Sequence, residues 1–253
     1  MIPLDVAQEP AAEPRRGTHE SAERVQTIFD RIAPVYDQFN DWLSLGLHRV
    51  WKRMAVKWSG AQVGDRCLDI CCGSGDLALL LAQRVGRSGS VVGLDFSASQ
   101  LAIAQERSRV AGDQSAPVEW VQGDALDLPF PAEHFDAVTM SYGLRNVVDI
   151  AQALAEVHRV LKPGAIAAIL DFHRPEPGPL QAFQDWYLET IVVSTAQRFG
   201  MTDEYAYISP SLAQFPTGQE QKAIALQAGF AQATHYPIAG GMMGVLVVQK
   251  SSP

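Results

Sequence analysis

Short apolar runs alternate with longer stretches of helical period through most of the chain. The runs are almost continuous in apolar residues, as in strands that are buried on both faces of a sheet. Such runs lie at residues 66–72, 90–96, 118–125, 135–144 and 165–172, and helical stretches lie at 76–86, 97–112 and 147–164. The last of these stretches ends at Gly164, a residue typical of helix ends. This alternation predicts an α/β domain with a mostly parallel sheet, right-handed connections and helices on both faces.

Four segments lie outside this alternation. Residues 233–239 and 243–250, joined through a Gly-Gly pair, predict a closing antiparallel hairpin that brings the sheet to seven strands. Residues 21–60 and 174–218 are rich in aromatic side chains. We expect them to form a cap over the carboxyl ends of the strands, where open α/β sheets bind their ligands.

Composition and charge restrict the classes of function. The 253 residues, 47% of them hydrophobic, can bury one sizeable core. Residues 1–20 are rich in Pro, Ala and Glu and predict a disordered tail, so that 21–253 form a single domain. The net charge of −8 gives no positive field for a phosphate backbone, so nucleic acid is not an expected partner. No apolar run reaches the ~20 residues that cross a bilayer, and we expect a cytoplasmic protein.

Three cysteines lie close together in the first predicted strand and the turn after it. Cys67, Cys71 and Cys72 are too close in sequence to form a disulfide framework, which suits a reducing compartment. No further cysteine or histidine nearby completes a tetrahedral metal site. We therefore expect small buried side chains and no metal.

A glycine-rich turn joins the first predicted strand to the first helix. Gly73, Gly75 and Ala78 match the pattern G-x-G-x-x-[GA] of dinucleotide sites, and Asp95 follows 20 residues after Gly75 at the end of the second strand. An acid there accepts hydrogen bonds from ribose hydroxyls. These features fit NAD and equally fit other adenosine ligands.

Asp76, in the first turn of that helix, separates the two kinds of ligand. A carboxylate there repels a pyrophosphate, which needs the helix N-terminus. S-Adenosylmethionine has no phosphate, and its ammonium group is attracted by carboxylates. The alternative is that Asp76 only caps the helix. Asp124 with Ala125, and Ser141, end the third and fourth strands and are expected at the adenine and near the transferable methyl group.

From Val25 onward the chain resembles the ubiquinone/menaquinone biosynthesis C-methyltransferase family of class I S-adenosylmethionine-dependent enzymes. The first family signature is matched by YDQFNDWLSLGLHRVW, residues 36–51, with Phe39 in place of Met. The second is matched more loosely by RVLKPGAIAAILDFH, where Ala165, Asp171 and His173 depart from the family pattern. The resemblance implies a class I, Rossmann-like methyltransferase fold.

The resemblance also indicates a substrate and a site. Further segments, such as RPEPGPLQ, look like the cyanobacterial and chloroplast branch, whose members methylate the ring of 2-phytyl-1,4-naphthoquinone. It adds Ser74 to the cofactor contacts. The expected cofactor site is then Asp69, Gly73, Ser74, Gly75, Asp95, Phe96, Asp124, Ala125 and Ser141.

Ring methylation requires an electron-rich carbon, so we expect the reduced quinol as substrate, with a base or a charge-stabilising donor beside its hydroxyl. The candidate catalytic residues are Arg145, Asn146, Tyr36, His48 and His173. In each case a structural role is the alternative: Arg145 can pair with Asp149, His48 can lie on a helix surface, and Tyr36 can pack in the cap.

Residues 42–58 are a candidate for peripheral membrane contact. They contain no acid, and four cations alternate with three tryptophans: Arg49, Lys52, Arg53 and Lys57 with Trp42, Trp51 and Trp58. In the alternative, the tryptophans belong to the core of the cap and the cations form a solvated face. Residues 179–199 have a similar ambiguity, because Phe183, Tyr187, Ile191 and Phe199 suit either core packing or a tunnel for an isoprenoid tail.

Other functions stay open at this point. Demethylmenaquinone and a benzoquinol are alternative substrates, an NAD-dependent oxidoreductase is the competing enzyme, and a non-catalytic S-adenosylmethionine-binding protein is a third possibility. The oligomeric state is not visible in the sequence.

Overall fold

The structure is a computed structural model that describes residues 44, 46–110, 115–176, 178–193 and 208–252. Several predictions fall outside these ranges. They are the tail at residues 1–20 and the positions of Tyr36, Phe39, Trp42 and Phe199.

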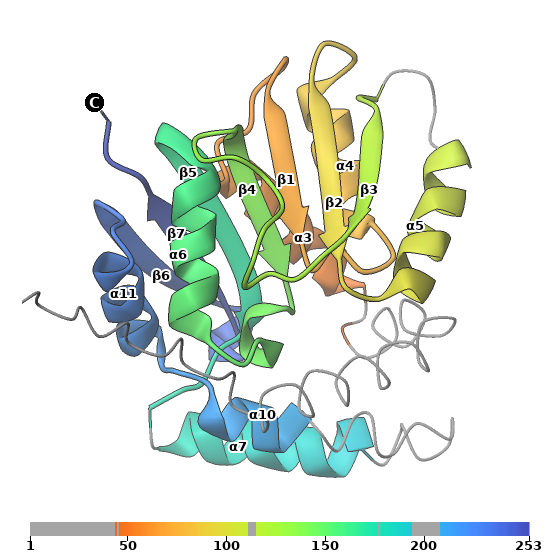
Figure 1. The fold of residues 1–253 in the computed structure, drawn as a ribbon. Helices are drawn as coiled ribbons and strands as arrows, with labels where there is room; N and C mark the ends of the chain where they lie inside the picture. Colours follow the sequence, from red (N-terminus) through yellow and green to blue (C-terminus); the bar gives the residue numbers. More distant parts are fainter. Residues whose placement is uncertain (1–43, 45, 111–114, 177, 194–207, 253) are drawn as a thin grey trace, which may run out of the picture.

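Seven strands form a single sheet, as predicted, and their order is β3-β2-β1-β4-β5-β7-β6 (Figure 1). Their bounds are β1 Arg66–Ile70, β2 Ser90–Asp95, β3 Val118–Gln122, β4 Phe135–Ser141, β5 Leu161–Phe172, β6 Gln232–Ile238 and β7 Met243–Gln249. Strands β1 to β5 are parallel, and β7 is antiparallel to both β5 and β6. The carboxyl ends of the five parallel strands therefore meet at one edge, which is the lower edge in Figure 1.

Helices cover both faces of the sheet, with α6 and α11 in front and α3 and α4 behind in Figure 1. The helix bounds are α3 Leu47–Trp58, α4 Asp76–Val85, α5 Ala98–Val110, α6 Ile150–Val160, α7 Pro179–Tyr187, α10 Ile208–Gln214 and α11 Gly218–Gln227, with shorter turns η1 Leu144–Asn146, η2 Leu188–Val193 and η3 Ala239–Gly241. Among the described residues no helix is both long enough and apolar enough to cross a membrane.

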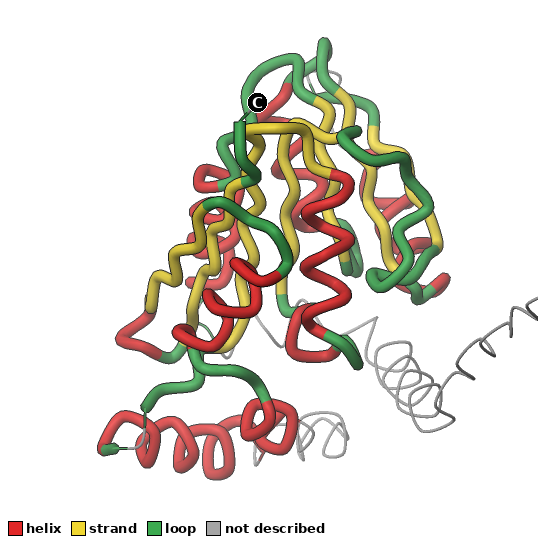
Figure 2. The backbone as a smooth tube through the Cα atoms, turned by 60° about the vertical axis from the view of Figure 1, so that its left-hand side comes forward, coloured by secondary structure: helices red, strands yellow, loops and turns green. Residues whose placement is uncertain are grey.

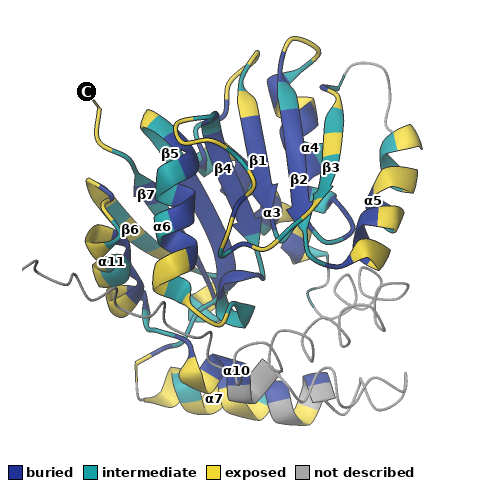
Figure 3. Cartoon of the chain, in the orientation of Figure 1, coloured by how far each residue is buried: buried dark blue, intermediate teal, exposed yellow. Residues whose placement is uncertain are grey.

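The central strands are buried on both faces, which explains their continuous apolar runs (Figure 3). One core cluster packs β1, β4 and β5 against α6, with Phe135 and Leu154 fully buried. A second cluster packs Leu77 and Leu81 of α4 onto the opposite face. The two layers hold the strands rigidly, so the residues after each strand have fixed positions.

One predicted boundary is wrong. Gly164 does not end a helix, because α6 ends at Val160 and β5 begins at Leu161. Leu161 pairs with Phe135 beside a register shift, and Gly164 adopts φ 77° within the strand, where its N–H donates to the Ser251 carbonyl. The glycine thus serves a strand irregularity instead of a helix C-cap.

Helices α7 and α10 lie beyond the carboxyl ends of the strands (Figures 1 and 2). The Gln184 side chain of α7 is buried and donates to the carbonyl of His173 at 2.9 Å, which ties α7 to the end of β5. Phe183 is 51% exposed and Trp186 is 52% exposed, so core packing is the wrong interpretation for Phe183. Tyr187 does pack against the core, together with the buried Leu188 and Val192.

Candidate active site at the carboxyl ends of the strands

The glycine turn follows β1 directly and is held by its own hydrogen bonds. Gly73 and Gly75 have φ of 53° and 90°, a region that glycine adopts without strain. The Gly75 N–H donates to the Cys72 carbonyl at 2.9 Å. A Cβ on Gly75 would lie 2.6 Å from the Trp120 ring, so this glycine is required by packing against β3 and does not line the cavity.

Asp95 links the ends of β1 and β2. One of its carboxylate oxygens accepts the Gly73 N–H at 2.8 Å, and the other accepts the Ser97 N–H at 2.9 Å. The carboxylate also lies in the cavity lining. Asp95 therefore orients the turn and presents acceptors to the cavity at the same time.

A cavity opens at this edge of the sheet, above the ends of β1, β2, β3 and β4. It brings together seven of the nine predicted cofactor residues: Gly73, Ser74, Asp95, Phe96, Asp124, Ala125 and Ser141. It is also lined by residues that the sequence analysis did not assign to the cofactor site, among them Lys52, Asp76, Gln100, Tyr142 and Asn146. These residues come from segments far apart in the chain.

Besides Gly75, one other predicted cofactor residue does not line the cavity. It is Asp69, which lies inside the sheet. Its carboxylate accepts the Thr139 hydroxyl at 2.7 Å across the β1–β4 pair. Burial raises the pKa of this carboxyl to about 7, although the Thr139 hydrogen bond and the Lys52 charge lower it. Asp69 is thus a structural acid beneath the glycine turn.

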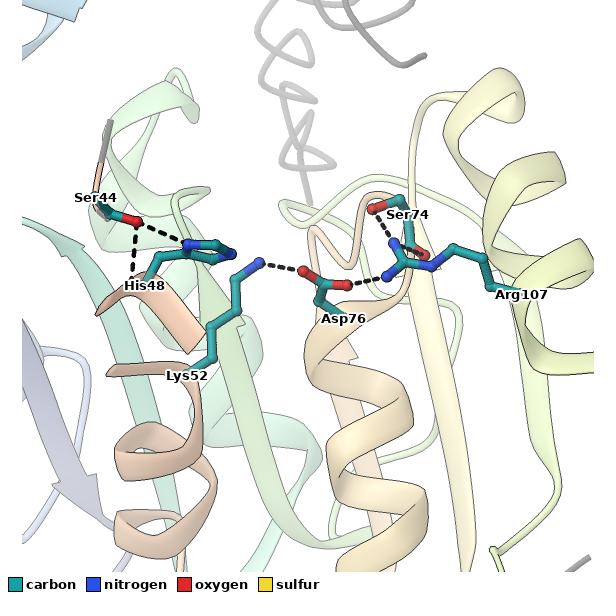
Figure 4. Close-up of polar contacts among 6 residues, drawn as sticks. All are labelled: Ser44, His48, Lys52, Ser74, Asp76 and Arg107. Carbon is teal, nitrogen blue, oxygen red and sulfur yellow. Dashed lines mark hydrogen bonds and ion pairs between the residues drawn. The ribbon is translucent and has the colours of Figure 1, made fainter. Parts of the chain in front are cut away.

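Asp76 lies between two cations (Figure 4). Lys52 of α3 donates to one of its carboxylate oxygens at 2.7 Å, and Arg107 of α5 donates to the other. Burial raises the pKa of Asp76, but the charges and hydrogen bonds of the two cations outweigh it and hold this pKa below its usual value. Arg107 also donates to the Ser74 hydroxyl at 2.9 Å, so the same cluster positions the cavity wall.

This cluster changes the argument made from sequence. Asp76 is not an isolated carboxylate, because two cations surround one acid, and it cannot be expected to repel a pyrophosphate. The capping alternative does not hold either, because Gly75 is the N-cap and its helix start has no side-chain cap hydrogen bond. The choice between a dinucleotide and S-adenosylmethionine must therefore rest on other evidence.

The turn after β4 forms the other wall of the cavity. Tyr142 has φ 58°, an uncommon conformation for a residue with a side chain. Its carbonyl accepts hydrogen bonds from Arg145 at 3.0 Å and from the Asn146 amide at 2.9 Å, which hold this conformation. Asn146 lines the cavity, and its Oδ1 is buried without a hydrogen-bond partner among the described residues. A buried acceptor of this kind is expected to receive a donor from a ligand.

Arg145 lies behind this turn. Its backbone N–H donates to Asp171 at 3.1 Å, its guanidinium lies 3.6 Å from the same carboxylate, and it stacks 5.2 Å from the Phe172 ring centroid. It does not pair with Asp149, which instead caps α6 by accepting the Gln152 N–H. Arg145 does not line the cavity, so it holds the turn in place from the protein side.

Both candidate histidines with described positions also lie outside the cavity lining. His48 is buried on α3 and its Nδ1 is 2.8 Å from the Ser44 hydroxyl, so it is not a surface residue. His173 follows β5, and its ring centroid is 5.0 Å from that of His235. Burial lowers the pKa of His173, which favours its neutral form.

The chain matches the model of the ubiE/COQ5 methyltransferase family over residues 17–250. It belongs to this family. It is therefore a methyltransferase, and family membership sets aside the oxidoreductase alternative that the glycine turn alone left open.

Curated relatives of the ubiE/COQ5 family share much of the sequence. A 2-phytyl-1,4-naphtoquinone methyltransferase of Nostoc sp. is 62% identical over 227 residues, covering 90% of this chain and 99% of the relative. The chloroplastic 2-phytyl-1,4-beta-naphthoquinone methyltransferase of Arabidopsis thaliana is 49% identical over 237 residues, covering 93% and 91%.

Solved structures show the fold. A SAM-dependent methyltransferase of Thermotoga maritima matches with a TM-score of 0.62 at 20% identity, covering 90% of this chain and 100% of that one. A phosphoethanolamine-type N-methyltransferase of Haemonchus contortus, solved with S-adenosylhomocysteine, matches with a TM-score of 0.67 at 17% identity, covering 90% and 60%. The ubiE/COQ5 member thus has the S-adenosylmethionine-dependent methyltransferase fold that the sequence predicted.

Lys52 lines the cavity, although the sequence predicted only a place in the candidate membrane-contact segment 42–58. The structure buries Lys52 against Asp76 and packs Trp51 and Trp58 beside β5 and β7. Lys52 is buried, and the two tryptophans are half-buried. Their position on the inner side of α3 could not be read from the alternation of basic and aromatic residues.

The three thiols occupy the positions expected of small packing residues. Cys67 and Cys72 are buried, Cys71 is half-buried, and none forms a disulfide. Burial raises the pKa of Cys67 to about 12 and raises those of the other two well above the usual value. Thiols of this kind are poor nucleophiles.

Proposed function

We propose that this protein transfers a methyl group from S-adenosylmethionine to a ring carbon of a prenylated naphthoquinol, namely 2-phytyl-1,4-naphthoquinol. The identity of 62% to a relative with that named substrate supports the proposal. The observation that carries it is the pairing, in one cavity, of a predicted adenosine site with the buried acceptor of Asn146.

The donor set of the cavity fits S-adenosylmethionine. Asp95 presents acceptors for the ribose hydroxyls, Asp124 and Ala125 lie at the end of β3 for the adenine, and Phe96 adds an aromatic wall. The Asp124 Oδ1 accepts the Leu126 N–H at 2.9 Å, which leaves its other oxygen for an amino group. When bound at these residues, S-adenosylmethionine would supply an electrophilic sulfonium methyl group for transfer to the ring carbon, with S-adenosylhomocysteine as the leaving group.

Asn146 is the residue that we assign to the acceptor. Its amide nitrogen is committed to the Tyr142 carbonyl, and this fixes Oδ1 as the group that receives a hydrogen bond. A quinol hydroxyl can donate to it, whereas the carbonyl of an oxidised quinone cannot. Accepting this hydrogen bond increases electron density on the hydroxyl oxygen and so on the adjacent ring carbon, which is the nucleophile.

Arg145 acts indirectly. Its guanidinium pairs with Asp171 and donates to the Tyr142 carbonyl, which fixes the turn. It also places a positively charged group near the developing oxyanion. Tyr36, His48 and His173 stay candidates for groups that close over the acceptor. The donor and acceptor must be held in line, and such positioning supplies much of the acceleration in a displacement at carbon.

The cap is also part of the proposal. The described parts of the predicted cap lie at the cavity edge, with α3 contributing Lys52 to the cavity and α7 and α10 lying beyond the strand ends. Helix α10 packs near η1, the turn that contains Asn146. A prenyl tail that leaves the cavity on this side would pass between these helices.

Shallow contact with a membrane from the cytoplasm would give a prenylated substrate access to this edge. The exposed side of α3 carries Leu47, Val50 and the cations Arg49, Arg53 and Lys57. Helix α7 adds exposed Leu180, Phe183 and Trp186 at the same edge of the molecule. Apolar and basic side chains together are suited to an anionic lipid surface.

The substrate assignment is tested by comparing kcat/KM for three reduced acceptors with saturating S-adenosylmethionine. These are 2-phytyl-1,4-naphthoquinol, a demethylmenaquinol and a benzoquinol of the ubiquinone type. We expect both naphthoquinols to react and the phytyl compound to be preferred. A preference for the benzoquinol would contradict the proposal and leave only the methyltransferase assignment.

A further inference from the structure

Lys52 is the one cation among the described residues that line the cavity. The residue is only 5% exposed, and its ammonium points from α3 toward the start of α4 (Figure 4). A buried lysine needs compensation, and Asp76 provides it at 2.7 Å. An ammonium has three N–H donors, so this pair leaves donors for a ligand.

The order of the strands fixes which end of the cofactor meets Lys52. The residues proposed for the ribose and the adenine follow β2 and β3, on one side of β1. The rest of the molecule must then extend over the β1–β4 side, where Ser141 and Tyr142 line the cavity. Helix α3 packs on β4, β5 and α4 at this side. The amino-acid end of the cofactor is thus directed toward Lys52.

That end carries a carboxylate, which needs donors or a cation. The glycine turn offers few, because the Gly73 N–H is used by Asp95 and the Gly75 N–H by the Cys72 carbonyl. The Asp76 charge is opposed by both Lys52 and Arg107, so this three-residue cluster carries a net positive charge. Lys52 and Asp76 of this cluster both line the cavity, and Lys52 is the member that attracts a carboxylate.

We propose that Lys52 binds the carboxylate of S-adenosylmethionine and makes the site selective for a ligand with an intact amino-acid end. The inference rests on the proposed function, since it names the subsite for that cofactor. Helix α3 precedes β1 and is not part of the glycine-turn pattern. In this proposal it completes the cofactor site through Lys52.

Binding to the ligand-free protein tests this inference without any turnover. Isothermal titration is carried out with S-adenosylhomocysteine and with S-adenosyl-3-thiopropylamine, which is the same molecule without the carboxylate. We expect K52M to weaken binding of S-adenosylhomocysteine by about tenfold or more, as for loss of a charge-assisted hydrogen bond. Binding of the carboxylate-free ligand should be unchanged or tighter. Equal weakening of both ligands, or of neither, would overturn the inference.

Two further variants isolate the cause. Lys57 is an exposed lysine on the same helix, and K57M should leave both dissociation constants unchanged. In K52M, Asp76 keeps only Arg107 as a partner. The double variant K52M/D76N also removes the charge of Asp76. If that double variant recovers the preference for S-adenosylhomocysteine, Lys52 acts only by neutralising Asp76, and direct binding is excluded.

A measurement on the wild-type protein covers the case in which K52M does not fold. The 15Nζ resonance of Lys52, assigned with K52R, should shift when S-adenosylhomocysteine binds and stay in place with the carboxylate-free ligand. The same response to both ligands would contradict the inference. Failure of the wild type to bind S-adenosylhomocysteine at all would instead contradict the proposed function, so the two failures are distinguishable.

Discussion

Asp171 holds Arg145 by two contacts, accepting its backbone N–H at 3.1 Å and lying 3.6 Å from its guanidinium. Asp171 ends β5 and Arg145 follows β4, so this pair joins two neighbouring strands at their carboxyl ends. Through Arg145 the pair supports the Tyr142 carbonyl, on which Asn146 also depends. Asp171 is therefore a positioning residue for the acceptor wall of the cavity.

Replacing Asp171 should separate catalysis from cofactor binding. D171N leaves the buried Arg145 charge without its partner and loosens the turn, so we expect kcat to fall by about tenfold to a hundredfold. The dissociation constant of S-adenosylhomocysteine should change little, because Asp171 does not line the cavity. D171E, which keeps the charge, should retain more activity than D171N, and E176Q at a nearby exposed acid is the control. Wild-type kcat in D171N would refute the positioning role.

Asn146 should affect the acceptor and not the cofactor. N146A removes both the support of the Tyr142 carbonyl and the buried acceptor, and we expect kcat/KM for the quinol to fall by about tenfold or more. Steady-state kinetics with both substrates varied measure this effect, and V63S, at an exposed residue before β1 and outside the cavity lining, is the control. If only the KM for S-adenosylmethionine changes in N146A, the assignment to the acceptor is wrong.

Asp69 should make stability depend on pH. Burial raises its pKa to about 7, so the folded state binds a proton more tightly than the unfolded state, whose pKa is about 4. This contribution therefore improves as pH falls from about 7 toward 4, and it is least favourable above 7. D69N cannot ionise and still accepts from Thr139. We expect D69N to have a higher free energy of unfolding than wild type by about 1 kcal/mol or more near pH ~8.

Urea unfolding at two pH values measures this difference. The gain of D69N should shrink near pH ~5, where the wild-type carboxyl is protonated in the folded state. A gain that is the same at both values would show that Asp69 does not titrate in this window.

Membrane contact should depend on α7. The double variant F183S/W186S removes two large exposed side chains, and we expect its partition to anionic liposomes at low salt to fall by about tenfold or more. Val63 is 73% exposed and precedes β1, at the opposite edge of the sheet, so V63S is the control. Liposome flotation measures the bound fraction. Equal partition of wild type and F183S/W186S would remove α7 from the docking surface.

The sequence predicted most of the fold because buried parallel strands leave a simple signal. The runs at residues 66–72 and 90–96 became β1 and β2 within two residues, since both faces of these strands are buried and most of their positions are apolar. Gly164 was wrongly predicted to end a helix, because a glycine with positive φ occurs in a strand bulge as well as at a helix end. Which of the two forms depends on pairing with a segment distant in sequence, here the strand that begins at Phe135.

The site was only partly predictable for the same reason. Residues that end parallel strands, such as Asp95 and Ser141, could be placed because the carboxyl ends of these strands meet at one edge. Lys52 and Asp76 could not, because their interaction spans 24 residues of sequence and depends on how α3 packs beside α4. The sequence favoured S-adenosylmethionine because the Asp76 carboxylate was expected to repel a pyrophosphate. That ligand is correct, but the reason is wrong, because Lys52 and Arg107 neutralise Asp76.

The central claim is tested most directly by methyl transfer from labelled S-adenosylmethionine to 2-phytyl-1,4-naphthoquinone, with the acceptor oxidised in one reaction and chemically reduced in the other. The proposed role of Asn146 requires a hydroxyl donor, so label should appear in the ring-methylated product only under reduction. Transfer to the oxidised quinone at the same rate would contradict the quinol mechanism. Absence of transfer in both reactions, from a protein that binds S-adenosylhomocysteine, would contradict the assigned acceptor.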